Sequence, residues 1–405
     1  MTALHPDIWA APAAPSSPVW DAVEAIIASG SRLCLAVTGG GSRALTWMLD
    51  HPGASAAVLE ACIPYSADAL AAYLQSPGPH RADADTARRL ACRARARAVS
   101  AADAGRTMGC GCTAALATRR TRRGQDRAHI AVRRSAAYEL VDVAFARGWG
   151  TRSDQEGVVS AALLAALLPA AEPVRRQLLP AIDGVEVARR SVPACEPVEE
   201  LLDGTRACTW CAADGAPVPA PEPGRLILLP GSFNPVHRGH LELAAAAARR
   251  AARMPALELS VENVDKPLLT YEEVLRRLGR LGGATPVALT RAPTFVHKAR
   301  LLPGAWYAIG YDTAARLVEP RYYGGTASAV RAALAQLEGA GARFLVAGRL
   351  VADGYRTLAD LTVPDEFRHL FEAIPETDFR ADVSSTELRS SGSSEPADAA
   401  GEEAG

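Results

Sequence analysis

The feature that most constrains the fold is a short, almost wholly apolar run, Arg225–Leu229, followed by a turn rich in glycine, proline and histidine and then by an alanine-rich stretch, Leu241–Arg253. A short apolar run of this kind predicts a strand buried on both faces, as in a parallel sheet. The alanine-rich stretch predicts a helix, since alanine has the highest helix propensity. Strand, turn and helix in this order begin an α/β fold, in which ligands bind beyond the carboxyl ends of the strands.

The same alternation continues along the second half of the chain. Thr270 and Glu273 have the spacing of a capping box and predict a helix that runs to about Leu281. The pattern therefore predicts an α/β protein whose C-terminal domain is a doubly wound, mostly parallel, Rossmann-like sheet. A strand predicted at Arg32–Val37 makes the N-terminal half a second α/β domain. The other predicted strands of the second half are 257–261, 287–290, 306–309 and 344–347.

Proline and glycine indicate where one domain ends and the next begins. The segment from Cys195 to Gly224 contains several prolines and scattered glycines, which do not continue a helix or a central strand. Both ends of the chain are rich in Ala, Ser, Pro or Gly and are predicted to be disordered. The predicted division is a flexible tail and lead-in at 1–30, an α/β domain at 31–190, a linker at 191–224, an α/β domain at 225–390 and a disordered tail at 391–405.

Composition excludes several classes of protein. Hydrophobic residues make up 49% of the chain and charged residues 22%, which is typical of a folded globular protein. A net charge of −1 provides no global positive field, so we expect no nucleic-acid partner. We also expect no membrane partner, because no apolar run approaches the roughly 20 residues of a spanning helix. Eight irregularly spaced cysteines favour a reducing compartment and a cytoplasmic location, and the sequence leaves self-association open.

The turn after the first strand of the second half carries candidate phosphate-binding residues. Its helix would direct free N–H groups and the positive end of its dipole toward the turn. His237 and His240 lie three residues apart and can both donate hydrogen bonds to phosphate oxygens. The simpler alternative is a polar turn with two surface histidines. The turn residues expected to contact a nucleotide are Gly231, Ser232, Phe233, Asn234 and Gly239.

This turn carries a family resemblance. The string GSFNPVHRGH matches the G-x-F-[DN]-P-x-H-x-G-H signature of the nucleotidylyltransferase superfamily, and DVSSTELR near the end of the chain resembles its I-S-S-T-x-[IL]-R motif. In that second motif Ser384, Ser385 and Thr386 are expected to contact the nucleotide, and Arg389 to hold phosphate with its planar fork of donors. The resemblance implies that His237, His240 and Arg389 act in catalysis.

Two further segments refine the resemblance. Adenylyltransferases of this superfamily often have a phosphate-contacting lysine after the second strand, and Lys266 lies there. Only two of the 44 basic residues are lysines, which favours a function for Lys266 and draws attention to Lys298, whose role the sequence leaves open. The segment with Gly310 and Asp312 is similar to the I-G-x-D segment of nicotinate and nicotinamide mononucleotide adenylyltransferases.

The reaction implied is attack by the phosphate of a mononucleotide on the α-phosphorus of ATP, with Mg²⁺ and release of pyrophosphate. Catalysis would consist of positioning and of charge stabilisation, with no resident metal. The alternatives are adenylyl or cytidylyl transfer to another acceptor, such as a phosphopantetheine, or a nucleotide-sensing or scaffold protein without turnover.

The N-terminal half resembles the C-terminal domain of the CinA family, some of whose members deamidate nicotinamide mononucleotide. The resemblance lies in the glycine-rich turn Thr38–Ser42, in Ser55 and in Tyr65. Where that family has a glutamate and a serine this chain has Leu35 and Ala36, and where it has a lysine this chain has Leu70. A serine without a neighbouring base is a weak nucleophile. The domain is therefore expected to be non-catalytic and to bind a ligand or dimerise.

Three other features are expected to be structural. Cys208 and Cys211 have metal-ligand spacing but lack the four ligands of a structural zinc site. The segment Gly109–Thr113 is predicted to be a close-packed turn, although a glycine-lined edge of a pocket is the alternative. The arginine runs at 88–97 and 119–134 lack interleaved aromatic residues and are predicted to be solvated helix faces.

Overall fold

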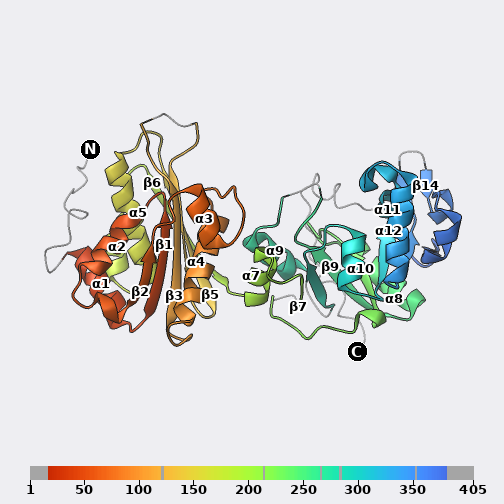
Figure 1. Ribbon diagram of the computed structural model, residues 1–405, viewed down its shortest axis with the longest axis horizontal. Coiled ribbons are helices and arrows are strands. Elements are labelled where there is room, and N and C mark those ends of the chain that lie inside the picture. Colours follow the sequence, from red (N-terminus) through yellow and green to blue (C-terminus); the bar gives the residue numbers. More distant parts are fainter. Residues whose placement is uncertain are drawn as a thin grey trace, which may run out of the picture. The chain divides into compact units, whose positions relative to one another are not determined.

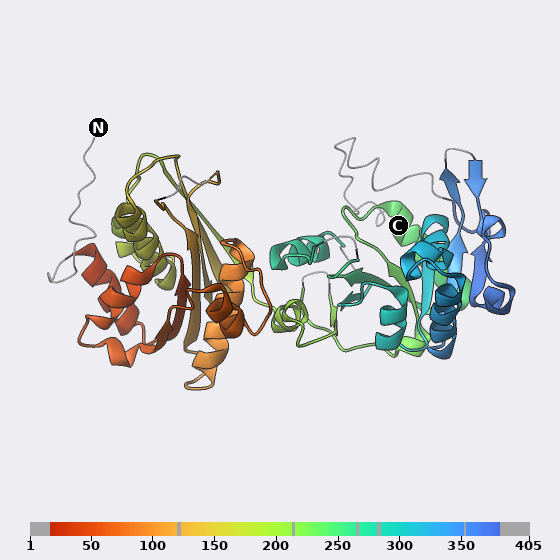
Figure 2. The same ribbon diagram turned by 45° about the horizontal axis from the view of Figure 1, so that its top comes forward.

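The chain folds into two compact units, residues 1–194 and residues 195–405, each described by itself (Figures 1 and 2). No helix in the described part of the chain is both long enough and apolar enough to span a membrane. The computed structural model describes residues 17–119, 123–212, 215–264, 267–281, 285–351 and 354–380.

The first unit is built on a six-stranded mixed sheet. Its strand order is β2-β1-β3-β4-β5-β6, in which β2, β1 and β3 are parallel and the strands from β3 to β6 are antiparallel. The strands are β1 (Arg32–Thr38), β2 (Val58–Cys62), β3 (Thr107–Ala115), β4 (Arg127–Arg133), β5 (Ala137–Phe145) and β6 (Val185–Pro193). The helices are α1 (Pro18–Ala28), α2 (Ser42–Leu49), α3 (Ala67–Leu74), α4 (Ala84–Val99), α5 (Arg152–Leu167) and α6 (Val174–Leu178), with a 3₁₀ turn η2 (Ala54–Ala56).

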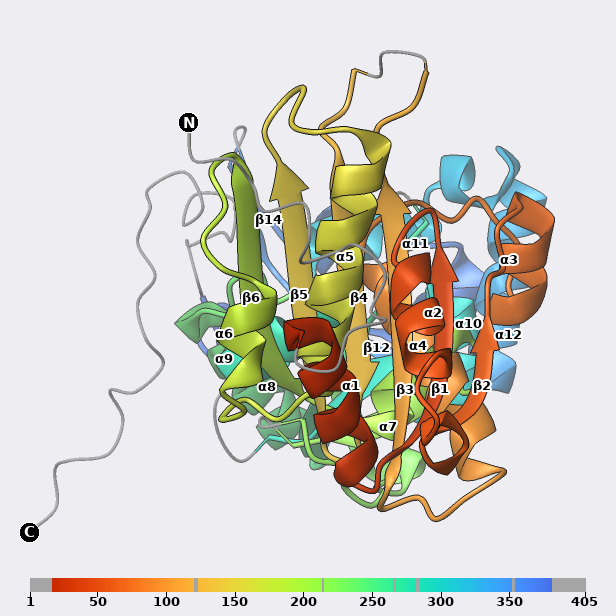
Figure 3. The ribbon, with the colours of Figure 1, turned by 90° about the vertical axis from the view of Figure 1, so that its left-hand side faces the viewer.

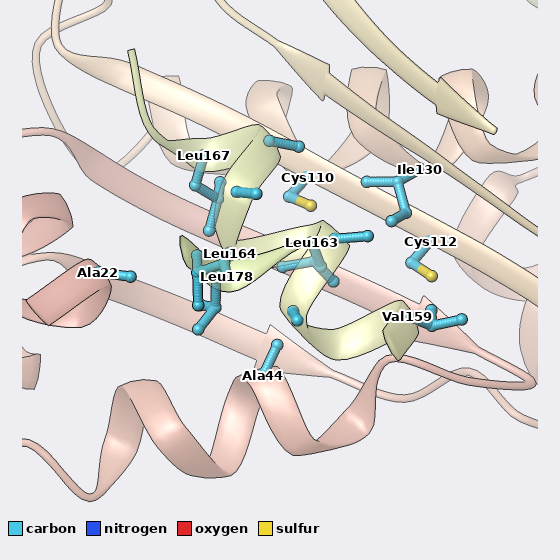
Figure 4. Packing of buried hydrophobic residues seen from close by; sticks show 14 of the residues in the cluster. Ala22, Ala44, Cys110, Cys112, Ile130, Val159, Leu163, Leu164, Leu167 and Leu178 are labelled. Carbon is cyan, nitrogen blue, oxygen red and sulfur yellow. The ribbon is translucent and has the colours of Figure 1, made fainter. Parts of the chain in front are cut away.

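Helices cover both faces of this sheet. Helices α1, α2, α5 and α6 pack on one face, and α3 and α4 lie on the other (Figures 1 and 3). The apolar run that forms α5 provides most of the core on its side, since the side chains from Val158 to Leu167 are at most 2% exposed. Leu163 and Leu164 of α5 belong to the same apolar cluster as Cys110 and Ile130 of the sheet (Figure 4).

Helix α4 lies unusually close to β3. A Cβ atom at Gly109 would lie 2.1 Å from the carbonyl oxygen of Ala91, and one at Gly111 would lie 2.2 Å from that of Ala87. Only glycine allows the helix backbone to approach the strand this closely. Close packing was therefore the correct prediction for Gly109–Thr113, but the segment is a strand and not a turn.

The second unit is built on a seven-stranded sheet whose order is β15-β12-β11-β8-β9-β10-β7. All neighbouring strands are parallel except β10 and β7. The strands are β7 (Cys208–Cys211), β8 (Leu226–Pro230), β9 (Met254–Ser260), β10 (Val287–Thr290), β11 (Trp306–Gly310), β12 (Arg343–Ala347) and β15 (Phe371–Ile374), with a separate hairpin of β13 (Arg349–Val351) and β14 (Gly354–Arg356). The predicted fold class, two α/β domains with a doubly wound and mostly parallel C-terminal sheet, is confirmed.

Helices of the second unit also lie on both faces of its sheet. Side chains of α10, α11 and α12 pack into one apolar cluster with alternate strand residues such as Leu228, Tyr307 and Phe344. Helix α8 packs against β8 and β9. The helices are α7 (Glu196–Asp203), α8 (Arg238–Ala251), α9 (Tyr271–Arg280), α10 (Phe295–Leu301), α11 (Tyr311–Val318) and α12 (Ala327–Gly339), with 3₁₀ turns η3 (Pro223–Arg225), η4 (Pro320–Tyr323), η5 (Leu358–Asp360) and η6 (Asp365–Leu370).

The segment 191–224 contains regular structure where the sequence predicted a linker. Along the chain, the first unit ends at Ala194 and the second begins at Cys195, and α7 follows at once. Strand β7 then pairs antiparallel with β10 at the edge of the second sheet. Its four residues carry too weak a pattern to be recognised beside so many prolines.

Candidate functional site

The turn singled out in the sequence lies at the point where the second sheet changes direction. The chain runs from β8 outward through β9 and β10, then returns to the other side of β8 to form β11, β12 and β15. In doubly wound sheets nucleotides bind beyond the carboxyl ends of the strands at such a switch point. The turn leaves β8 at Pro230 and enters α8 at Arg238, so it lies at this position.

The turn is folded around the side chain of Phe233. This residue has a φ of +44° and is only 1% exposed. A Cβ atom at Gly231 would lie 2.7 Å from its ring, so glycine is needed there to make room for Phe233. Phe233, predicted to contact a nucleotide, is thus a buried anchor of the turn.

Two arginines of α9 hold the turn from outside. Arg276 donates to the side-chain oxygen of Asn234 at 2.9 Å, and Arg277 donates to the carbonyl oxygen of Ser232 at 2.8 Å. Both arginines also bond to Glu273, and the hydrogen bond from Arg276 lowers the pKa of Glu273 to about 2. The sequence analysis missed this clamp, although the Glu and Arg spacing on a capped helix was a visible sign of it.

His237 and His240 lie together at the start of α8. His237 is the N-cap residue, Gly239 lies in the first turn, and the two imidazole rings are 3.8 Å apart between centroids. Burial, with a smaller contribution from His237, lowers the pKa of His240 to about 4, so that ring is neutral at pH 7.

The tautomer of His240 follows from its contacts. The backbone N–H of His237 donates to Nδ1 of His240 at 3.2 Å, which leaves the ring proton on Nε2. The rings of His240 and Phe233 are in T-shaped contact, with centroids 5.3 Å apart. The His240 ring and the N-terminus of α8 thus provide N–H donors beside the turn, and an anionic ligand requires such donors.

A cleft of about 830 Å³ opens beside the turn. It has the size of a small-molecule site. The described residues that line it include Gly231 and Ser232 from the turn but neither histidine. Many lie in the segment between Pro293 and Tyr323. Lining side chains relevant to chemistry are Glu258, Arg277, Phe295, Lys298, Arg316 and Tyr323.

A buried ion pair lies in the wall of this cleft. Nζ of Lys298 is 2.7 Å and 2.8 Å from the two carboxylate oxygens of Glu258. Glu258 is 1% exposed and Lys298 7% exposed, and the hydroxyl of Thr290 also donates to Glu258. The sequence drew attention to Lys298 only through the scarcity of lysine.

The other predicted site residues fall into two groups. Gly310 is the N-cap residue of α11, with open space where a Cβ atom would lie. Asp312, in the first turn of α11, is ion-paired with Arg349 at 2.5 Å. The remaining predictions concern Lys266, Ser384, Ser385, Thr386 and Arg389, which lie outside the described residues.

In the first unit, the glycine-rich turn Thr38–Ser42 ends at an occupied helix N-terminus. Oε1 of Glu156 accepts hydrogen bonds from the backbone N–H of Ser42 at 2.6 Å, from its hydroxyl at 2.9 Å and from the N–H of Arg43 at 3.3 Å. A carboxylate of the chain itself therefore occupies the position at which α2 would bind an anion.

Two of the departures from the CinA pattern lie in one apolar cluster. Ala36 and Leu70 are 0% and 8% exposed and pack together with Leu74 and Leu90. Tyr65, which the pattern retains, is 67% exposed. The positions that carry a serine and a lysine in the family are therefore part of an apolar core in this chain.

Comparison with known proteins agrees with the geometry of the second unit. Residues 228–391 match the cytidylyltransferase-like family. This family model begins inside β8 and extends through the SSTELR segment. The cytidylyltransferase-like region supports nucleotidyl transfer in general terms and does not select a substrate. No curated protein matches the chain.

Solved structures similar to this chain are CinA-superfamily proteins. One from Escherichia coli is 14% identical, covers 37% of this chain and 85% of its own, and has a TM-score of 0.31. One from Enterobacter cloacae is 18% identical, covers 40% of this chain and 92% of its own, and has a TM-score of 0.30. No residue role follows from a likeness of this size.

The structure also places the remaining features that the sequence analysis singled out. No three His, Cys, Asp or Glu residues there are grouped as a metal site would require. Cys208 and Cys211 lie three residues apart on β7, so their side chains point to opposite faces of the sheet. Both lie before the cytidylyltransferase-like region in the sequence. Arg88 and Arg133 are 2% and 4% exposed, so the prediction of solvated faces is wrong for these two arginines.

Proposed function

We propose that residues 225–390 transfer AMP from ATP to the phosphate of nicotinate or nicotinamide mononucleotide, with release of pyrophosphate. The observation that carries the proposal is the position of GSFNPVHRGH, which joins β8 to α8 at the switch point of the sheet. The match to the cytidylyltransferase-like family, which includes this string, also supports nucleotidyl transfer.

The proposed step is an in-line displacement. A phosphate oxygen of the mononucleotide bonds to the α-phosphorus of ATP while the bond from that phosphorus to the pyrophosphate oxygen breaks. The N-terminus of α8 and the Nε2 proton of neutral His240 stabilise the negative charge that develops. His237, Lys266 and Arg389 are proposed to bind the phosphates, and Gly310 and Asp312 to lie beside ATP.

Mg²⁺ fits this proposal. It is usually held by substrate phosphates and one or two carboxylates, so a site without a preformed acidic cluster suits it. In the described residues there is no such cluster. Bound with the phosphates, Mg²⁺ would offset their charge in the transition state.

The test is pyrophosphate release by the full-length protein with Mg²⁺ and either ATP or CTP. Each nucleotide is combined separately with nicotinate mononucleotide, nicotinamide mononucleotide and phosphopantetheine, and product masses are measured. Release with ATP and a pyridine mononucleotide supports the proposal. If pyrophosphate is released only with CTP or only with phosphopantetheine, the proposed reaction is replaced by that other nucleotidyl transfer. If the protein binds ATP but releases no pyrophosphate with any acceptor, it is a nucleotide sensor.

We further propose that the first unit carries no deamidase chemistry. Ala36 and Leu70, which stand where the family pattern has a serine and a lysine, are buried in one apolar cluster, and Glu156 already occupies the N-terminus of α2. A ligand-binding or dimerising role is compatible with this arrangement.

A further inference from the structure

The buried pair of Lys298 and Glu258 occupies a position that a substrate can reach. Both residues line the cleft, although each is less than a tenth exposed. Glu258 lies on β9, and Lys298 lies on α10, directly after β10. Such a pair costs desolvation energy unless its geometry is good and its other hydrogen-bonding groups are satisfied. Its position in the wall of a ligand-sized cleft indicates a role in binding.

The pair belongs to the half of the sheet opposite the expected ATP residues. A doubly wound sheet consists of two mononucleotide-binding halves, and its ligands extend across the switch point between them. Gly310 ends β11 and Asp312 follows it in one half, whereas Glu258 and Lys298 lie on β9 and α10 in the other. Under the proposed function, the acceptor mononucleotide occupies this second half, with its phosphate at the turn.

The rest of this half suits a planar ring. Phe295 and Tyr323 line the same cleft, and the ring of Phe295 is fixed by edge contact with Tyr307 at 5.4 Å between centroids. Aromatic walls bind flat heterocycles by stacking. The base of the acceptor therefore lies where Lys298 can reach its substituent.

Lys298 has one hydrogen bond left to give. An ammonium group has three donors, and two of them are directed at the carboxylate oxygens of Glu258. Within the described ranges, the third has no protein acceptor. Glu258 already accepts three hydrogen bonds, two from Lys298 and one from Thr290, and an ionised carboxylate has no hydrogen of its own to donate to the ligand.

The charge of the pair decides which substituent suits it. Lys298 and Glu258 together carry no net charge, so a neutral carbonyl oxygen can accept the third hydrogen bond without introducing charge. A carboxylate at the same place would bring a second negative charge beside buried Glu258, where water screens poorly. Among the other cations that line the described part of the cleft, Arg277 and Arg321 are paired with Glu273 and Glu319. Arg316 is exposed, where water screens its charge.

We infer that Lys298 and Glu258 are specificity-determining residues that select an acceptor with a neutral carboxamide over one with a carboxylate. The substrate class is thus a mononucleotide of nicotinamide type. This inference rests on the proposed function and names the acceptor of that site.

The test compares the two pyridine mononucleotides as acceptors for the full-length protein and for Glu258→Gln. The unaltered protein is expected to prefer the amide by about tenfold or more in kcat/KM. Glu258→Gln keeps the shape of the side chain but leaves the charge of Lys298 without compensation. We expect it to shift the preference toward the acid by about tenfold, through KM of the acceptor, with KM for ATP unchanged.

Glu262→Gln is the matched control, because Glu262 is near in sequence, pairs with Arg291 and does not line the cleft. It removes one negative charge and is expected to leave the preference unaltered. A preference of the unaltered protein for the acid overturns the inference even if no variant folds. The inference is also overturned if a folded Glu258→Gln protein keeps the original ratio of kcat/KM for the two mononucleotides. The same holds if Glu262→Gln changes that ratio as much as Glu258→Gln does. In both cases the proposed function is unaffected. Turnover of neither mononucleotide overturns both.

Discussion

His240 combines two properties that depend on its surroundings more than on its type. Its ring is neutral because it is buried against His237, and its proton lies on Nε2 because Nδ1 accepts from the backbone. A neutral donor held in place by the chain fits the role of stabilising charge that appears only in the transition state.

Replacement of His240 by alanine tests that role. We expect turnover to fall about a hundredfold, the effect of removing one preorganised donor to a developing anion. Pyrophosphate release measures it. The matched control is His369→Ala, an exposed histidine paired with Glu338. Unchanged turnover in a folded His240→Ala protein would contradict the assignment.

The depressed pKa of His240 also predicts how stability depends on pH. The pKa is about 4 in the folded protein, against 6.5 for an unperturbed histidine. The unfolded chain therefore binds the proton first as the pH falls. The stabilisation from the neutral ring is complete above pH 6.5 and is lost progressively toward pH 4. Urea unfolding across this range should show a smaller decline for His240→Gln than for the unaltered protein, and equal declines would disprove the burial argument.

At the scale of residues, the sequence predicted what lies close together in the chain. His237, His240 and Gly231 were found because they share one turn that follows a strand. Glu258 and Lys298 were not found as a pair, since they are 40 residues apart and meet only because β9 and β10 are neighbours. A contact of that kind requires the strand order, which the sequence pattern alone does not provide.

At the scale of elements, prediction was best where a strand is buried on both faces. Strands β8 to β12 of the second sheet appear as short apolar runs between helices, and each was predicted to within a few residues. Strand β3 contains Gly109 and Gly111 and so looked like a turn. Its glycines serve the packing of α4, and such packing is not visible in local sequence.

Because α4 packs so closely on β3, we expect a small substitution at their contact to have a large effect on the free energy of unfolding. In Gly111→Ala the new methyl group would collide with the backbone of α4, so helix and strand must separate. We expect the free energy of unfolding to fall by about 3 kcal/mol. Chemical denaturation measures it, with Gly105→Ala as the control because its nearest contact would be 3.7 Å away. Equal stability of the two variants would show that α4 can move without cost.

At the scale of the whole molecule, the second unit carries the proposed nucleotide site. In the first unit, the chain's own side chains fill the positions that resemble the CinA site. We expect the full-length protein to release no ammonia from nicotinamide mononucleotide in the absence of ATP. A coupled ammonia assay tests this. Ammonia release that is abolished by Ser55→Ala would contradict the prediction and assign chemistry to the first unit.

Because β7 pairs with β10, the folded second unit begins earlier in the chain than the region that matches the cytidylyltransferase-like family. The cytidylyltransferase-like match begins at residue 228, whereas the strand that completes the sheet lies earlier, at Cys208–Cys211. A protein cut at the start of the match would leave the backbone donors and acceptors of β10 bare along one side, and such an edge recruits strands from other molecules. Strand β7 ends at Cys211, and sixteen residues separate it from Leu228, where the match begins. A fragment that starts at the match is therefore expected to aggregate more readily than one that includes β7.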